Sequence, residues 1–126
     1  MVPKIRDVDQ MSIKEIGSAL RKTSRLCRDL KIDKKEFFGG SMTISSLGGI
    51  GGTFFTPIIN PPEVAILGVG KSFDRLVKVK DKFVSRKILP ISLSYDHRII
   101  DGAEGARFCV YLGKCLGKDF AFKLAV

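Results

Sequence analysis

Apolar residues near the start of the chain recur at helical spacing. Ser12 and Glu15 have the spacing of a capping box, in which an N-cap hydroxyl and a glutamate three residues later bond each other's backbone amides. The apolar residues of the next turns fit a repeat of 3.6 residues, and they are Ile13, Ile16, Leu20, Cys27 and Leu30. This pattern predicts a long helix over about residues 12–30, followed by a short helical turn near residues 33–36 that Gly39–Gly40 ends.

The segment at residues 41–46 alternates between polar and apolar side chains. Met42 and Ile44 fall on one face and serine and threonine on the other, which predicts a strand with a polar face. The glycines of the following loop, residues 48–52, permit positive φ and close backbone approach, so a turn or close packing is favoured over a ligand cradle. The proline-bearing segment at residues 57–62 is expected to be extended and irregular.

The second half of the chain continues with strands and ends in a helix. Residues 64–69 are mostly apolar and predict a buried strand. Strand character resumes unevenly at residues 77–79, turns around residues 80–82, and returns over residues 83–95 as a long antiparallel partner. A last helix is expected over about residues 102–117. The residues that it is expected to bury are Phe108, Cys109, Leu112, Cys115 and Leu116.

Composition places these elements in one domain. The chain has 126 residues, of which 44% are hydrophobic and 28% charged, an ordinary balance for a globular domain that buries a core. No run approaches the roughly 18 apolar residues of a membrane span, and no secretory signal is evident, so no membrane association is expected. The elements together predict an α/β (α+β) fold with a mixed, largely antiparallel sheet covered by helices.

The basic residues give the chain a formal net charge of +9. Clustered cations favour nucleic-acid binding, but the clustering is modest and no zinc-finger, basic-zipper or RNP pattern accompanies it. One group is expected on the solvated face of the first helix: Arg21, Lys22, Arg25 and Arg28. A second group flanks the predicted hairpin turn: Lys78, Lys80, Lys82, Arg86 and Lys87. A solvated surface is therefore preferred, attraction of an anionic small ligand or an acidic partner is the alternative, and no nucleic-acid partner is expected.

Three cysteines, Cys27, Cys109 and Cys115, form no Cys-x-x-Cys pair. They cannot all pair with one another, so we expect reduced thiols in a reducing compartment and a cytoplasmic protein. A tetrahedral zinc site needs about four suitably spaced ligands, and a single histidine does little to supply them. No bound metal is therefore expected.

The single histidine, His97, stands where a predicted strand gives way to the last helix. Asp101 is the expected N-cap of that helix, and Glu104 completes a capping-box-like pair. A histidine held at a rigid strand end is well placed to exchange protons near neutral pH. Each candidate also has a plain structural interpretation: a hydrogen-bonded structural histidine, a helix cap for Asp101, and for Ser45 one hydroxyl on a polar strand face.

The run Asp96–Gly102 favours the chemical interpretation. Its sequence, Asp-His-Arg-Ile-Ile-Asp-Gly, resembles the D-H-R-x-x-D-G signature of the acyltransferase components of 2-oxoacid dehydrogenase complexes. The resemblance also covers residues 39–52, 57–69 and 89–108 in the family's order. Within the family, the chain is most similar to the bacterial dihydrolipoamide acetyltransferases of pyruvate dehydrogenase. The resemblance implies that residues 1–126 are the C-terminal part of the catalytic domain, a partial domain with a chloramphenicol-acetyltransferase-like fold.

The resemblance implies acyl transfer between the thiols of dihydrolipoamide and coenzyme A, with both as substrates and no metal. In this pattern His97 is the general base that takes the proton from the attacking thiol, and Ser45 donates a hydrogen bond to the tetrahedral oxyanion. Both roles agree with the chemistry, because a thiol with a pKa of about 8.5 is mostly protonated near neutral pH and a thioester oxygen gains negative charge on attack. Asp101 matches a position that organises the active-site turn and is counted with the catalytic residues.

The resemblance also implies an oligomer. In the family the site lies between subunits of a trimer, with the histidine of one chain facing the serine side of its neighbour, and trimers assemble into a large core that binds the other subunits of the complex. The apolar residues of the tail fit either docking on another trimer or packing on the chain's own helix, and they are Phe120, Phe122, Leu124 and Val126. Because the family's catalytic domain is longer than this chain, a catalytically silent core-assembly fragment is the alternative to an active enzyme.

Overall fold

The computed structural model describes residues 2–117 and Phe120. This part of the chain divides into two compact units: the first combines residues 2–41 with residues 112–117 and Phe120, and the second comprises residues 42–111. The two alternatives for the apolar tail, docking on another trimer or packing on the chain's own helix, concern three residues outside the described part of the chain, namely Phe122, Leu124 and Val126.

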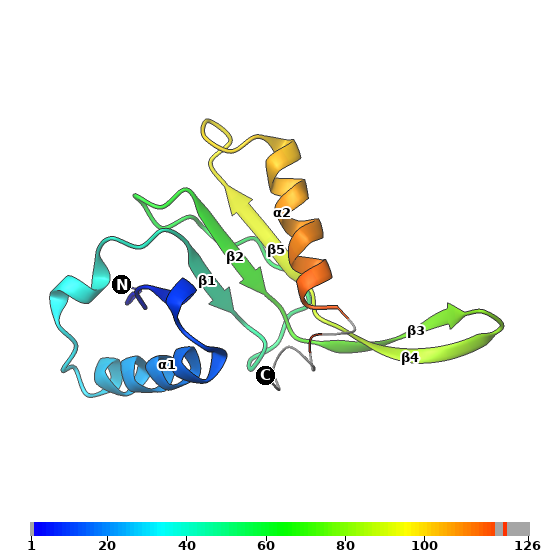
Figure 1. Cartoon of the computed structure of the whole chain (residues 1–126), viewed down its shortest axis with the longest axis horizontal. Helices are drawn as coiled ribbons and strands as arrows, with labels where there is room; N and C mark the ends of the chain where they lie inside the picture. Colours follow the sequence, from blue (N-terminus) through cyan, green and yellow to red (C-terminus); the bar gives the residue numbers. More distant parts are fainter. Residues whose placement is uncertain (1, 118–119, 121–126) are drawn as a thin grey trace. The chain divides into compact units, whose positions relative to one another are not determined.

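The first unit contains the long helix and two short 3-10 turns (Figure 1). Helix α1 spans Ile13–Arg28, and the 3-10 helices η1 and η2 span Val8–Gln10 and Lys34–Phe37. The predicted capping box is confirmed, since Glu15 N donates to Ser12 Oγ at 3.3 Å and Ser12 N donates to Glu15 Oε2 at 2.7 Å. The bonds from Ser12 lower the pKa of the Glu15 carboxyl because they stabilise its ionised form. The long helix and the short turn after it are both confirmed.

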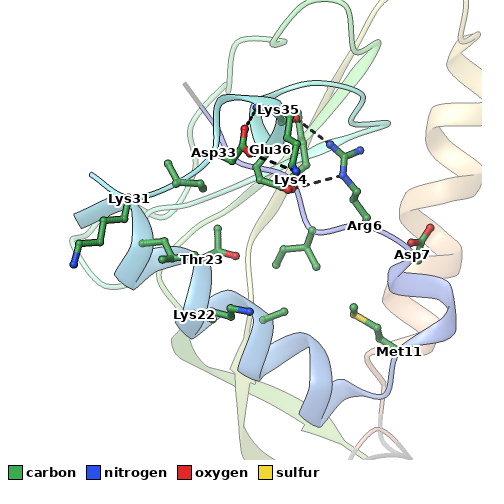
Figure 2. A pocket seen from close by; sticks show the side chains of 14 residues that line it. Lys4, Arg6, Asp7, Met11, Lys22, Thr23, Lys31, Asp33, Lys35 and Glu36 are labelled. Carbon is green, nitrogen blue, oxygen red and sulfur yellow. Dashed lines mark hydrogen bonds and ion pairs between the residues drawn. The ribbon is translucent and has the colours of Figure 1, made fainter. Parts of the chain in front are cut away.

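The N-terminal segment of this unit runs beside η2 (Figure 2). Lys4 N donates to Glu36 O at 2.7 Å, and Arg6 Nε lies 3.6 Å from the Glu36 carboxylate. The Arg6 guanidinium also donates to the carbonyls of Lys35 and Phe38, at 3.1 and 2.9 Å. Together with residues of α1, four of these residues line a cavity of about 540 Å³, namely Lys4, Arg6, Lys35 and Glu36. The apolar side chains that line it are Ile5, Met11, Ala19, Leu26 and Ile32.

The second unit contains two separate sheets (Figure 1). A three-stranded sheet has the order β1-β2-β5, with β1 at Thr43–Ser46, β2 at Ala65–Val69 and β5 at Ile91–Tyr95. Strand β1 runs parallel to β2, and β2 runs antiparallel to β5. A hairpin is formed by β3 at Phe73–Val79 and β4 at Lys82–Ile88. The predicted mixed α/β (α+β) fold is confirmed.

The prediction of one long strand over residues 83–95 is wrong. The stretch is divided at Leu89–Pro90, so that β4 pairs with β3 whereas β5 pairs with β2. Proline has no amide hydrogen to donate to a ladder. The Pro90 carbonyl instead accepts from Gly70 N at 3.0 Å. The chain therefore leaves the hairpin and enters the other sheet at this point.

The core of this unit lies on β2. Its buried apolar residues in the described part of the chain are Ala65, Ile66 and Leu67. The buried strand predicted at residues 64–69 is confirmed. The faces of β1 are reversed from the usual arrangement, because Ile44 is 67% exposed and Thr43 only 6%. The Thr43 hydroxyl donates to the buried Glu63 carboxylate, and this bond satisfies the polar group that faces inward.

Helix α2 spans Gly102–Cys115, so the predicted last helix is confirmed, but its predicted buried face is partly wrong. Phe108 and Leu116 are 40% and 41% exposed, and the buried residue of the helix is Gly105. The half-buried residues are Cys109, Leu112 and Cys115. A side chain at position 105 would begin 2.8 Å from Tyr95 Cε1, so only glycine allows the helix to lie this close to β5. The contact therefore centres on a residue without a side chain, which apolar patterning does not detect.

Candidate active site

His97 lies in the turn that follows β5, and it is exposed. The turn begins at Asp96, whose N donates to Val64 O at 2.8 Å. The Asp96 carbonyl accepts from the amides of Ile99 and Ile100, both at 3.0 Å. The bond to Val64 ties the turn to the segment that enters β2, and the other two bonds close the turn itself. The exposed position argues against a buried structural histidine and leaves the imidazole open to a ligand.

Asp96 and Arg98 form an ion pair on either side of His97 in the sequence. The guanidinium donates from Nε to both carboxylate oxygens, at 3.0 and 3.2 Å, and from Nη2 to Oδ2 at 2.7 Å. Arg98 N donates to Asp96 Oδ1 at 3.0 Å, which is the bond of an Asx turn. The side-chain and backbone bonds from Arg98 lower the pKa of the Asp96 carboxyl to about 2. In the other direction, the carboxylate raises the pKa of the Arg98 guanidinium.

The Tyr95 ring lies beside His97. The two ring centroids are 5.7 Å apart, and the ring planes are tilted by 41°. The same tyrosine ring contacts α2 at Gly105. His97 Nε2 lies 3.8 Å from the point where a side chain at Gly102 would begin, so the imidazole nitrogen is close to the first residue of the helix. The imidazole is thus placed between a strand end and a helix start, next to an aromatic ring.

Asp101 caps this helix, as predicted. Its Oδ1 accepts from Glu104 N at 2.7 Å, and its carbonyl accepts from Gly105 N at 3.1 Å. The Glu104 carboxylate lies 3.8 Å from Arg107 on the next turn of α2. Asp101 therefore shapes the junction between the His97 turn and the helix through acceptor bonds, which need no proton transfer.

Ser45 lies on β1, away from His97 within one chain. The sheet register places Ser45 opposite Gly68, and Gly68 opposite Ser92. Ser45 and Tyr95 are therefore two strand spacings apart across the sheet and three residues apart along it, a Cα separation of about 14 Å. His97 lies in the turn that follows Tyr95. A single chain does not bring the two predicted catalytic side chains together.

An aromatic ring over Gly68, the residue paired with Ser45, was not predicted. The Phe55 ring covers Gly68, where a side chain would begin only 3.0 Å from Phe55 Cζ. Paired residues of neighbouring strands project from the same face, so Ser45 and Ser92 lie on either side of the glycine that this ring covers. The sequence signal was the glycine inside an apolar strand, which marks close approach of another group.

The glycine-rich loop at residues 48–52 forms the predicted turn. The amides of Ile50 and Gly51 both donate to Leu47 O at 2.9 Å. Gly51 and Gly52 have φ values of 150° and 83°, a region that glycine occupies without strain. Gly52 O accepts from Lys71 N at 2.9 Å, which fastens the end of the loop to the segment that enters β3.

Other kinds of site find less support in the described part of the chain. Within residues 2–117 and Phe120, no three histidine, cysteine or acidic residues gather as metal ligands would. No described helix has the length and apolar character needed to cross a membrane. The three cysteines are free and half-buried. His97, Asp101 and Ser45 are not among the residues that line the cavity in Figure 2.

The sequence matches a family model described as 2-oxoacid dehydrogenases acyltransferase (catalytic domain), over residues 1–121. The dihydrolipoyllysine-residue acetyltransferase component of the pyruvate dehydrogenase complex of Cupriavidus necator is 51% identical over 95% of this chain and 22% of that protein. The same component of Haemophilus influenzae is 51% identical over 92% of this chain and 20% of that protein. The chain therefore spans about a fifth of the length of these curated relatives.

Solved structures share the fold. The dihydrolipoamide acetyltransferase of Azotobacter vinelandii superposes with a TM-score of 0.90 at 48% identity, over 96% of this chain and 50% of that one. The cubic core of a pyruvate dehydrogenase multienzyme complex also gives 0.90, at 47% identity and over the same shares of the two chains. The A. vinelandii structure belongs to an investigation of a serine, a histidine and an asparagine in that enzyme's catalytic mechanism. There the serine precedes the histidine by 52 residues, and the asparagine follows it by four.

Proposed function

Since this chain belongs to the acyltransferase family of the 2-oxoacid dehydrogenase complexes, we propose that it contributes to an acetyltransferase site formed between two copies of the chain. The reaction moves an acetyl group between the thiols of dihydrolipoamide and coenzyme A. His97 of one copy is the general base, and Ser45 of the other donates a hydrogen bond to the oxyanion. The family resemblance carried by the run Asp96–Gly102 is confirmed.

A matching spacing carries this proposal. Ser45 precedes His97 by 52 residues, and Asp101 follows His97 by four. The serine, histidine and asparagine investigated in the A. vinelandii enzyme have the same two separations. Because the two chains superpose with a TM-score of 0.90 at 48% identity, equal spacing supports equal positions in the fold.

The proton transfer in this proposal begins at the imidazole. A thiol with a pKa of about 8.5 is mostly protonated near neutral pH, and its thiolate is the nucleophile. The neutral His97 takes the thiol proton of coenzyme A as the sulfur attacks the carbonyl carbon of acetyl-dihydrolipoamide. His97 suits this role because it is exposed at the end of β5 with Nε2 near the start of α2. The imidazolium that forms holds the proton needed later in the reaction.

The attack turns the thioester carbonyl into a tetrahedral oxyanion. The Ser45 hydroxyl of the other copy donates to this oxygen, which stabilises charge that develops in the transition state. When the intermediate collapses, the carbon–sulfur bond to dihydrolipoamide breaks and its sulfur takes the proton from His97. Acetyl-coenzyme A and dihydrolipoamide are the products, and both side chains return to their starting states.

Asp101 has a positioning role in this proposal. Its Oδ1 accepts from Glu104 N, and an asparagine oxygen can accept the same bond. The A. vinelandii enzyme has an asparagine four residues after its histidine, so a carboxylate is not required there. Asp101 therefore shapes the start of α2 next to His97, and the proton is exchanged by His97 alone.

The proposed site requires assembly. The register of the β1-β2-β5 sheet keeps Ser45 and His97 of one chain apart, so the two side chains must come from neighbouring copies. The solved cubic core of a pyruvate dehydrogenase complex, which shares this fold, supports a homotrimer that assembles further and binds the other subunits. Three free cysteines fit a reducing compartment, so the proposal places the protein in the cytoplasm.

Assembly without catalysis is a second candidate function. The chain matches half the length of the solved A. vinelandii chain and about a fifth of the curated relatives. Several large apolar side chains of the second unit are exposed and favour burial against another polypeptide. They are Ile44, Ile50, Phe54, Ile58, Leu76, Phe83 and Ile99. These observations fit a chain that contributes surface to a core without turnover of its own.

An acetyl-transfer assay tests the proposal and separates it from the second candidate. The full chain is supplied with S-acetyl-dihydrolipoamide and coenzyme A, and acetyl-coenzyme A is measured over time. Ser45→Ala is expected to lower the rate by about 10²- to 10³-fold, because one donor to the oxyanion is lost. Ser92→Ala removes a hydroxyl from the same sheet face on β5 and should leave the rate within about twofold. No transfer by the parent chain at any concentration would favour assembly without catalysis.

A further inference from the structure

Arg98 is an exposed cation next to the proposed base. Its side chain is 88% exposed, whereas that of Asp96 is 21% exposed. An exposed arginine beside His97 has two possible uses. It attracts the anionic groups of coenzyme A, or it holds the turn that carries the histidine. The guanidinium is committed to the Asp96 carboxylate through Nε and Nη2, which favours the second use.

All four polar atoms of Asp96 are hydrogen-bonded. Its N donates to Val64 O, and its carbonyl accepts from the amides of the third and fourth residues after it. Its two carboxylate oxygens accept from the guanidinium of Arg98, and Oδ1 also accepts from Arg98 N. The residues before and after His97 are therefore bonded to each other through both side chain and backbone. This closed set of bonds restricts the backbone of His97 from both sides.

From this geometry, and resting on the proposed function, we infer that Arg98 and Asp96 are positioning residues that hold the His97 imidazole where it meets the thiol. Arg98 acts through the Asp96 carboxylate and touches no substrate. The Tyr95 ring, 5.7 Å from the imidazole, supplies a second restraint. A misplacement of about 1 Å in a catalytic group can cost about 10²-fold in rate, so even partial loosening of the turn is measurable.

Substitution of Arg98 by lysine distinguishes the two roles, attraction of an anion and holding of the turn. The lysine ammonium keeps the positive charge but is a point donor without the planar Nε–Nη fork. Arg98→Lys therefore preserves attraction of an anion and loses the geometry of the Asp96 bonds, whereas Arg98→Gln loses both. Arg107 gives a matched control, because it is 69% exposed and its ion pair is with Glu104 on α2. Arg107→Gln removes an exposed paired arginine without changing the bonds of Asp96.

Steady-state acetyl transfer by the full chain gives the first test. Both Arg98 variants are expected to lower kcat about tenfold and to leave the KM for coenzyme A within about twofold, because the transition state is affected more than substrate binding. Arg107→Gln should leave both values unchanged. Parental kcat in Arg98→Lys overturns the inference. A raised KM in Arg98→Gln with parental kcat overturns it in favour of anion attraction.

An NMR measurement on the full chain gives a second test that needs no turnover. His97 is the single histidine, so one imidazole Cε1–H signal reports its surroundings. Beside the Tyr95 ring this signal is displaced by the ring current, and both Arg98 variants should move it toward the position of a free histidine. Arg107→Gln should leave it in place, and an unmoved signal in Arg98→Lys overturns the inference. If the chain transfers no acetyl group, the proposed function is refuted but the inference about Arg98 is not, because the NMR result still decides whether Arg98 positions His97.

Discussion

A chain carrying His97→Ala and a second chain carrying Ser45→Ala should restore acetyl transfer when they are mixed, although neither transfers acetyl groups efficiently alone. Each variant keeps the group that the other lacks. The sheet register places Ser45 and Tyr95 of one chain about 14 Å apart, and His97 lies in the turn after Tyr95. Under the proposed function, the two catalytic groups of a working site therefore come from different copies. A mixed oligomer therefore contains some complete sites.

The size of the recovery follows from counting interfaces. Each site takes His97 from one copy and Ser45 from the adjacent copy. In a random one-to-one mixture each of these two residues is intact in half of the cases, so about a quarter of the sites are complete in a cyclic oligomer. The assay is acetyl-coenzyme A formation after the two chains are unfolded, mixed and refolded together. His97→Ala mixed with the His97→Ala/Ser45→Ala double variant is the control, and it should recover nothing.

The result that refutes this reasoning is equally specific. Native mass spectrometry first establishes that mixed oligomers form. If such oligomers transfer acetyl groups no faster than the sum of the separate variants, the site does not combine His97 and Ser45 from two copies.

Three further outcomes follow from local contacts. Gly105→Ala places a methyl group 2.8 Å from a tyrosine ring and should cost about 1–3 kcal/mol of stability in thermal unfolding. Gly113→Ala, with open space around it, should cost nothing. Asp101→Ala should cost about 1 kcal/mol of helix-cap stability, whereas Asp101→Asn should stay close to parental in both stability and turnover. The Asp96 carboxyl should titrate near pH 2 by NMR and move toward its ordinary pKa of about 3.9 in Arg98→Gln. Because its pKa is lowered in the folded chain, its contribution to stability is present above about pH 4 and is lost as the pH falls toward 2.

Features set by neighbouring residues could be predicted from the sequence. The capping box of Ser12 and Glu15 starts α1 because both bonds close within three residues. The cap at Asp101 and the bonds that close the turn at His97 are local in the same sense, since they connect residues up to four positions apart. The run Asp96–Gly102 also carried the family resemblance, which is why the candidate base could be named from the sequence.

Features set by distant residues could not be predicted in the same way. The break at Pro90 separates two strands whose partners, β3 and β2, are chosen by pairing across the chain. The inward face of β1 depends on Thr43 meeting Glu63, twenty residues away, and alternation alone does not show which face is buried. The separation of Ser45 from His97 became visible only when the register of the three-stranded sheet was known.

The positioning bonds around His97 lie between these cases. An aspartate two residues before an arginine has the spacing of an Asx turn, which is a local signal. The anchor from Asp96 N to Val64 O is not local, because it joins the turn to the start of a distant strand. The motif therefore indicated the chemistry of His97, and the sheet explains how that residue is held.

The pH dependence of the loss caused by His97→Ala tests the central claim most directly. If His97 serves to deprotonate the thiol, a high pH makes this general base less necessary, because the thiol then ionises in solution. The thiolate fraction of a thiol with a pKa of about 8.5 rises roughly 30-fold between about pH 7 and pH 9.5. The parent-to-variant rate ratio should be about 10² to 10⁴ near neutral pH and should shrink steadily as the pH rises. A variant as fast as the parent at neutral pH, or a ratio that stays constant up to high pH, would contradict the assignment of His97 as the general base.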